Sequence, residues 1–206
     1  NNYSTDKGGG IYNHNAHAVY DKCEITNNEA SGQAGGIFEE YGNSRYDSCQ
    51  IVGNAASGAA GVLLDLLSDR VVMNNCEISG NESVSDGPAG GLLIQNSSPT
   101  LNNTTISGNA AVKEGGGVKI AAYNDGQSNP LFINCLISGN KVTGTGSTHH
   151  AGGGMYVSII DSNSDGSETV NDTLINTTLT GNYAHNCGGI YHHTDNVQDQ
   201  SAIQPV

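Results

Sequence analysis

Apolar residues recur along the chain at fixed positions inside short runs that glycine and asparagine interrupt. No window of eleven residues has the three-and-four spacing that is typical of an amphipathic helix, so we predict short strands separated by turns. The first repeated motif is a small residue, a glycine and an apolar residue. The apolar member is Ile11, Ile37, Val62, Leu92, Val118, Met155 or Ile190.

A second motif lies between successive copies of the first. It begins with Cys or Thr, has Ile or Leu two residues later, and closes with Asn after three more residues. The first residues of this motif are Cys23, Cys49, Cys76, Thr104, Cys135 and Thr177, and the last are Asn28, Asn54, Asn81, Asn109, Asn140 and Asn182. The regular alternation of two motifs identifies a repeat protein.

Units of about 26 residues cannot bury an apolar face alone, but stacked units can. The repeat therefore predicts an all-β right-handed parallel β-helix, a solenoid of about seven coils with successive strands ~4.8 Å apart. We assign residues 1–191 to this single domain, with inserts near 121–130, 141–150 and 160–172. Residues 192–206 are expected to be a tail or the start of a following segment.

Period-two alternation indicates which columns of equivalent residues face inward. The apolar residues of the first motif and the Cys or Thr column are predicted to line the core, with the cysteines acting as small hydrophobes. A disulfide between cysteines of neighbouring coils is the alternative, although parallel in-register Cβ atoms suit its geometry badly. The asparagines that close the second motif are expected to form a ladder of stacked amides at a turn.

Composition narrows the choice of partners. Only 35% of residues are hydrophobic, and the formal net charge is −13. Such an acidic chain with two arginines offers no basic stripe for a phosphate backbone, so we expect no nucleic-acid partner. No run of 18 apolar residues occurs, and we expect no membrane span in this chain.

The motif pair resembles the repeats of the chlamydial polymorphic outer membrane proteins, which are autotransporter-type surface adhesins. The likeness is carried by Gly-Gly-apolar alternating with apolar-x-x-Asn, often followed by Ala as in Asn109-Ala110-Ala111. The chain is also similar to the wider class of extracellular pectate-lyase-like β-helices. The resemblance implies a secreted or cell-surface protein engaged in adhesion or assembly.

One insert has the spacing of a calcium loop. The pattern D-x-[DN]-x-[DN]-G supplies oxygen ligands for Ca²⁺, with the glycine allowing a sharp turn. The predicted ligands are Asp161, Asn163, Asp165, Ser167, Thr169 and Asp172. The same residue types are common in any solvated turn, which is the alternative interpretation.

We call the glycine directly before the apolar residue of the first motif the anchor glycine. An outward column two residues after the anchor glycine is unusually apolar. It contains Tyr12, Phe38, Leu63, Leu93, Tyr156 and Tyr191, interrupted by Lys119. We expect this interaction stripe to be exposed and to contact another chain, a host or cell-surface protein, or a glycan. The alternative is that loops of the same chain cover it.

The strongest enzymatic candidates are Glu40 and Asp65, which are predicted to lie one coil apart on the same outer face. Their separation would suit a retaining glycosidase. Carboxylates on an exposed face are more often there for solvation. Our primary hypothesis is therefore a non-enzymatic extracellular structural or adhesin protein, which acts through its exposed face or by end-to-end self-association. A carbohydrate-active enzyme or sugar-binding module is the alternative.

Overall fold

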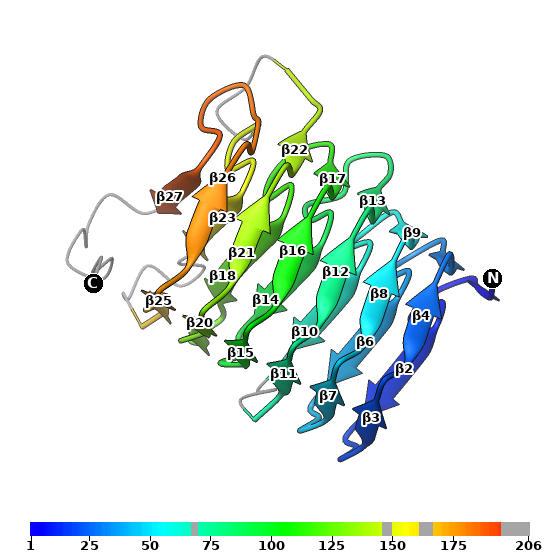
Figure 1. Ribbon diagram of the computed structural model, residues 1–206. Coiled ribbons are helices and arrows are strands. Elements are labelled where there is room, and N and C mark those ends of the chain that lie inside the picture. Colours follow the sequence, from blue (N-terminus) through cyan, green and yellow to red (C-terminus); the bar gives the residue numbers. More distant parts are fainter. Residues whose placement is uncertain (67–69, 146–149, 161–166, 195–206) are drawn as a thin grey trace.

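The computed structural model describes residues 1–66, 70–145, 150–160 and 167–194. Short parallel strands stack into an elongated solenoid, and the chain advances from one end to the other without doubling back (Figure 1). The predicted parallel β-helix is confirmed. In the part of the chain that the structure describes, no helix is long and apolar enough to cross a membrane.

The first motif forms the longest sheet, named sheet 1. Each of its strands begins directly after an anchor glycine. All its neighbouring strands are parallel and in the register that the repeat predicts, for example Ile11 beside Ile37 and Val62 beside Leu92. Its strands are β2 (Ile11–His14), β6 (Ile37–Glu40), β10 (Val62–Asp65), β14 (Leu92–Gln95), β18 (Val118–Tyr123), β23 (Met155–Ile160) and β27 (Ile190–Thr194).

Three further sheets complete the coils, each with six strands among the described residues. Sheet 2 contains β3 (Val19–Asp21), β7 (Arg45–Asp47), β11 (Val72–Asn74), β15 (Thr100–Asn102), β20 (Leu131–Ile133) and β25 (Thr173–Ile175). Sheet 3 is built by the second motif and contains β4 (Glu24–Thr26), β8 (Gln50–Val52), β12 (Glu77–Ser79), β16 (Thr105–Ser107), β21 (Leu136–Ser138) and β26 (Thr178–Thr180).

Sheet 4 is the shortest and follows the ladder asparagines. It contains β1 (Tyr3–Ser4), β5 (Glu29–Ala30), β9 (Ala55–Ala56), β13 (Glu82–Ser83), β17 (Ala110–Ala111) and β22 (Lys141–Val142). A pair of short strands, β19 (Gln127–Ser128) and β24 (Thr169–Val170), joins two of the inserts. The inserts therefore extend the solenoid sideways and leave its stacking unchanged.

The core runs the length of the solenoid and is lined by the predicted inward columns. Ile37, Val62, Leu92, Val118 and Met155 are fully buried, while Ile11 and Ile190 in the end strands pack against the same cluster and are partly exposed. Sheet 2 adds large inward side chains that the two sequence motifs did not identify. These are Tyr20, Tyr46, Met73, Leu101, Phe132 and Leu174.

The predicted asparagine ladder is present. In every member of the ladder before Asn182, the main-chain N–H and the side-chain amide both donate to the side-chain oxygen of the equivalent asparagine one coil further on. The ladder begins with Asn2, before the first complete motif, and continues through Asn28, Asn54, Asn81, Asn109, Asn140 and Asn182.

The left-handed turn residue is not the ladder asparagine but the residue before it. Asn27 has φ 54° and Gly80, its equivalent two coils later, has φ 60°. Asn and Gly are the residues that adopt this conformation at least cost, which explains the Asn or Gly before each closing asparagine. The ladder asparagine is then free to point its amide into the stack.

The Cys and Thr column is internal, as predicted, but it has a polar role. Cys76 Sγ donates to Tyr46 O one coil earlier and to Asn74 O within its own coil, both at 3.4 Å. Thr104 Oγ1 donates in the same way to Met73 O and Asn102 O. Both Cys and Thr occur in this column because each combines small size with a donor atom on Cβ. All five cysteines are free thiols in the structure.

The expected exposure of the interaction stripe is wrong for four of its six residues. Phe38, Leu63, Leu93 and Tyr156 are at most 3% exposed. Ala34, Ala59 and Ala89, two residues before the anchor glycine, fold over the outer face of sheet 1 and form a second apolar cluster with Phe38, Leu63 and Leu93. Only Tyr12 is well exposed, and Tyr191 is half-buried.

Candidate functional site

Glu40 and Asp65 lie where the sequence predicts, on neighbouring strands at the N-terminal end of sheet 1. They are direct register partners, Glu40 at the end of β6 and Asp65 at the end of β10. Parallel pairing places their Cα atoms about one strand spacing apart, ~4.8 Å. The fold therefore holds two carboxyl groups side by side on the outer face.

Glu40 is held by three side chains from the first coil. Tyr12 OH donates to Oε2 at 2.7 Å, His14 Nδ1 lies 3.0 Å from the same oxygen, and Lys7 Nζ is 3.3 Å from each carboxyl oxygen. Tyr12 and His14 lie on β2, directly beside β6, while Lys7 lies between β1 and β2, where it forms an isolated bridge with Gln33. The carboxylate is fixed in one orientation by these contacts.

The environment moves the pKa values of the two carboxyl groups in opposite directions. Burial raises the pKa of Asp65, the nearby charge of Glu40 raises it further, and the hydrogen bond from Tyr123 only partly opposes this. Burial also acts to raise the pKa of Glu40, but hydrogen bonds from Tyr12, His14 and Lys7 outweigh it and leave the net pKa below the usual value. Such a divergence is the pattern of a proton donor beside an ionised carboxylate.

Aromatic rings surround this pair. The ring of Tyr12 stacks on Phe38 with centroids 5.4 Å apart, and Lys7 Nζ lies 4.8 Å from the Phe38 ring centroid. Tyr41 follows Glu40 and meets His14 edge to face at 5.8 Å. Tyr12 and Tyr41 are 46% and 45% exposed, so each presents an accessible ring beside a carboxylate.

Tyr123, the last residue of β18, closes the other side of the site. Tyr123 OH donates to Asp65 Oδ1 at 3.1 Å, although the strand of Tyr123 is two coils further on. Asn96 assists this return because its Oδ1 accepts from the main-chain N–H of Tyr123 at 3.0 Å. We call the group Lys7, Tyr12, His14, Glu40, Tyr41, Asp65 and Tyr123 the acidic site.

A second carboxylate lies on the opposite face of the same strand. Glu39 is fully buried inside the solenoid, where it accepts from Asn13 Nδ2 at 2.7 Å, Tyr46 OH at 2.9 Å and the main-chain N–H of Ser44 at 3.2 Å. Burial, together with Glu39, raises the pKa of Tyr46. This internal network supports β6 from within, on the opposite side of the sheet from Glu40.

The predicted calcium loop falls mostly outside the described residues, which exclude Asp161, Asn163 and Asp165. Ser167 Oγ donates to Asp125 Oδ1 at 2.7 Å, Thr169 belongs to β24, and Asp172 is half-buried. Among the residues that the structure describes, no group of three or more His, Cys, Asp or Glu side chains is arranged to hold a metal ion. Calcium binding remains a prediction.

Comparison with known proteins identifies the family. The model of the family described as the right-handed β-helix region matches residues 1–198 of the chain. The chain belongs to this family. No curated protein and no solved structure matches it significantly. The right-handed solenoid is therefore established, and the β-helix family includes both enzymes and non-enzymes.

The sequence placed Glu40, Asp65 and Tyr12 on the outer face but did not bring Lys7, Tyr41 or Tyr123 to them. Lys7 and Tyr41 lie just outside the strands of sheet 1, at positions that the two motifs do not include. Tyr123 lies at the end of β18, which is two residues longer than β10, and the repeat gives no signal that its side chain reaches back two coils to Asp65.

Proposed function

We propose that this β-helix is a rigid structural and adhesive element of a secreted or cell-surface protein, and that the acidic site is its contact surface. The observation that carries the proposal is the gathering of the exposed Tyr12 and Tyr41 rings around Glu40 and Asp65. The asparagine ladder and the uninterrupted register give the stiffness that a surface rod needs. The likeness of the repeats to those of surface adhesins supports the location.

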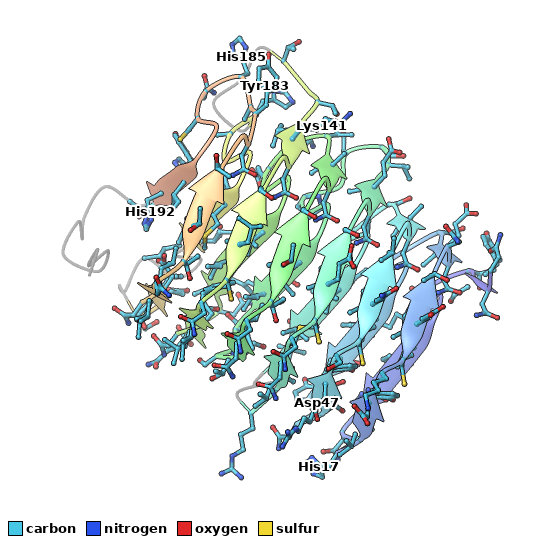
Figure 2. All side chains as sticks on the ribbon, in the orientation of Figure 1. His17, Asp47, Lys141, Tyr183, His185 and His192 are labelled. Carbon is cyan, nitrogen blue, oxygen red and sulfur yellow. The ribbon has the colours of Figure 1, made fainter. Side chains whose placement is uncertain are left out.

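Adhesion is tested with the chain immobilised on beads and exposed to glycan and cell-surface protein arrays. We expect binding by the native chain and loss of binding in a Tyr12→Ala variant. Tyr183→Ala is the matched control, because Tyr183 is 68% exposed and pairs with Lys141 of β22 at the far end of the solenoid (Figure 2). Equal binding by the native chain and both variants would refute the assigned surface.

End-to-end self-association is a further part of the proposal. Among the described residues, β2 and β27 are the outermost strands of sheet 1, and an outermost strand presents backbone groups that another parallel strand can pair with. Sedimentation velocity over a range of protein concentrations tests this. We expect elongated oligomers whose share rises with concentration, and a single monomeric species at every concentration would contradict it.

The divergent pKa values of Glu40 and Asp65 favour one alternative, a retaining glycoside hydrolase. Asp65 would give its proton to the leaving oxygen while Glu40 attacks the anomeric carbon. Water, deprotonated by Asp65, would then release the sugar from Glu40. Release of reducing sugar that both Glu40→Gln and Asp65→Asn abolish would establish this activity, whereas release that both variants retain would exclude the pair.

A further inference from the structure

The ligand class of the acidic site follows from its charge and its aromatic rings. Two carboxyl groups lie on adjacent strands, and the ion pairs around them bring one lysine, Lys7, to Glu40. Arg45, one of the two arginines, is engaged elsewhere through its 2.6 Å contact with Asp47 on sheet 2. A ligand that carried its own carboxylates would meet repulsion here and from a chain of net charge −13.

The same side chains are well suited to hydroxyl groups. The carboxylates accept hydrogen bonds from hydroxyl protons, while tyrosine hydroxyls and imidazole both donate and accept. The exposed rings of Tyr12 and Tyr41 add flat apolar surfaces that lose little conformational entropy when they are covered. A molecule with many hydroxyl groups and an apolar ring face satisfies both kinds of contact.

We propose that the acidic site binds glycans built from uncharged sugar rings and discriminates against polyuronates. This proposal rests on the acidic site being the contact surface of the protein, and it requires no cleavage of the glycan. Tyr12 and Tyr41 supply the ring contacts, and the adjacent carboxyl groups of Glu40 and Asp65 supply the discrimination against acidic sugars. The extent of the site is limited by Tyr123, which closes it toward the later coils.

Isothermal titration of the native chain tests the class directly. The probes are uncharged oligosaccharides of glucose, mannose and xylose, with oligogalacturonides of equal length as the acidic counterpart. We expect at least one uncharged series to bind at least tenfold more tightly than the oligogalacturonides at low salt. Binding of the acidic series with equal or greater affinity, or no binding of any uncharged series, would overturn the proposal.

Variants assign the binding to this site. Tyr12→Ala and Tyr41→Asn should each weaken binding about tenfold or more, and Tyr12→Phe should keep most of it because the ring remains. Asn is chosen for Tyr41 because this residue has φ 56°. Tyr183→Ala should leave the affinity unchanged. Equal losses in Tyr12→Ala and Tyr183→Ala, with melting temperatures preserved, would show that the glycan binds elsewhere.

Removal of one charge tests the discrimination separately. Asp65→Asn keeps the shape of the side chain and its ability to accept from Tyr123. It should lower about tenfold the ratio of the affinity for uncharged glycans to the affinity for acidic glycans. An unchanged ratio would refute the role of Asp65. Glycan binding without sugar release would support this proposal and reject the hydrolase, whereas surface adhesion without glycan binding would reject this proposal and leave the adhesive function standing.

Discussion

The side-chain oxygen of Asn109 accepts hydrogen bonds from both the main-chain N–H and the side-chain amide of Asn81, at 3.0 and 2.9 Å. Asn81 Nδ2 also donates to Ile51 O in the preceding coil at 2.9 Å. One buried amide thus connects three successive coils, so the stability of the ladder depends on each of its members.

Asn81→Ala is therefore expected to destabilise the protein strongly. The substitution removes the oxygen that accepts from the N–H and the side-chain amide of Asn54, and it removes the side-chain donor to Ile51 O, at a cost of about 1–3 kcal/mol for each buried group left unsatisfied. Urea unfolding should show a loss of at least about 3 kcal/mol. Asn129→Ala, at an exposed asparagine that receives one bond from Asn171, should cost less than about 1 kcal/mol. Similar losses for the two variants would contradict a special role for the ladder.

Gly61→Ala should be destabilising for a different reason. A Cβ at this position would lie 2.3 Å from Gly91 O in the next coil, so the coils would have to separate. We expect a loss of at least about 2 kcal/mol. Gly80→Asn is the control, because nothing lies within 4 Å of its added Cβ and Asn27 already occupies the equivalent turn position. Gly80→Asn should change the free energy of unfolding by less than about 1 kcal/mol, and a larger loss would show that this turn has no room for a side chain.

The two carboxyl groups of the acidic site should respond oppositely to pH. The lowered pKa of Glu40 means that its stabilisation is present above its unfolded pKa of about 4.3 and is lost as the pH falls through the folded value. The raised pKa of Asp65 means that its protonated form is favoured by folding, an advantage fully present below about pH 3.9 and lost as the pH rises through the folded value.

Glu40→Gln should therefore lower the free energy of unfolding at pH 7 by on the order of 1 kcal/mol, and Asp65→Asn should raise it. Both differences from the native chain should shrink as the pH is lowered toward 3, because the native carboxyl groups take up protons. Denaturant unfolding at the two pH values measures them. A destabilising Asp65→Asn at pH 7 would show that the ionised carboxylate is the favoured form.

The cysteines should differ in their reactivity. Burial raises the pKa of Cys49 and Cys135, and raises that of Cys76 to about 12, which disfavours the reactive thiolate. Cys23 is only half-buried, so alkylation of the native protein at pH 8, followed by mass spectrometry, should label Cys23 well before these three. Rapid labelling of Cys76 would indicate that the coils open locally.

A related substitution tests the polar role of the column. Cys76→Thr should be tolerated within about 1 kcal/mol, because Thr104 makes the same pair of hydrogen bonds in the next coil. Cys76→Ala should cost more, since it removes the donor and leaves a small cavity. The reverse order of stability would show that the column requires only small size.

Calcium should stabilise the chain if the loop from Asp161 to Asp172 binds it. A ligand that binds only the folded state adds about 2.7 kcal/mol at a hundredfold excess over its Kd. EDTA-treated protein should therefore melt at a higher temperature when millimolar calcium is added, and Asp165→Ala should remove the shift. An unchanged melting temperature in the native chain would mark the loop as an ordinary polar turn.

The repeat predicted the strands, their register and the ladder because stacking forces equivalent residues into columns. Burial of Phe38 and Leu63 could not be predicted from alternation, which assigns a side chain to a face but does not say what covers that face. Ala34 and Ala59 cover it through turns that alternation does not describe. Lys7 and Tyr123 belong to the acidic site for a similar reason, since their long side chains reach beyond their own coils.

The hydrogen bond from Tyr123 to Asp65 spans the coil of β14, in which Asn96 holds the main chain of Tyr123. A solenoid can gain or lose whole repeats by gene duplication or deletion and still stack. Loss of the coil between these residues would leave the architecture intact but move the tyrosine out of reach. Relatives of this chain should therefore vary freely in length after Tyr123, while those that retain the tyrosine and the aspartate should keep the same number of repeats between them.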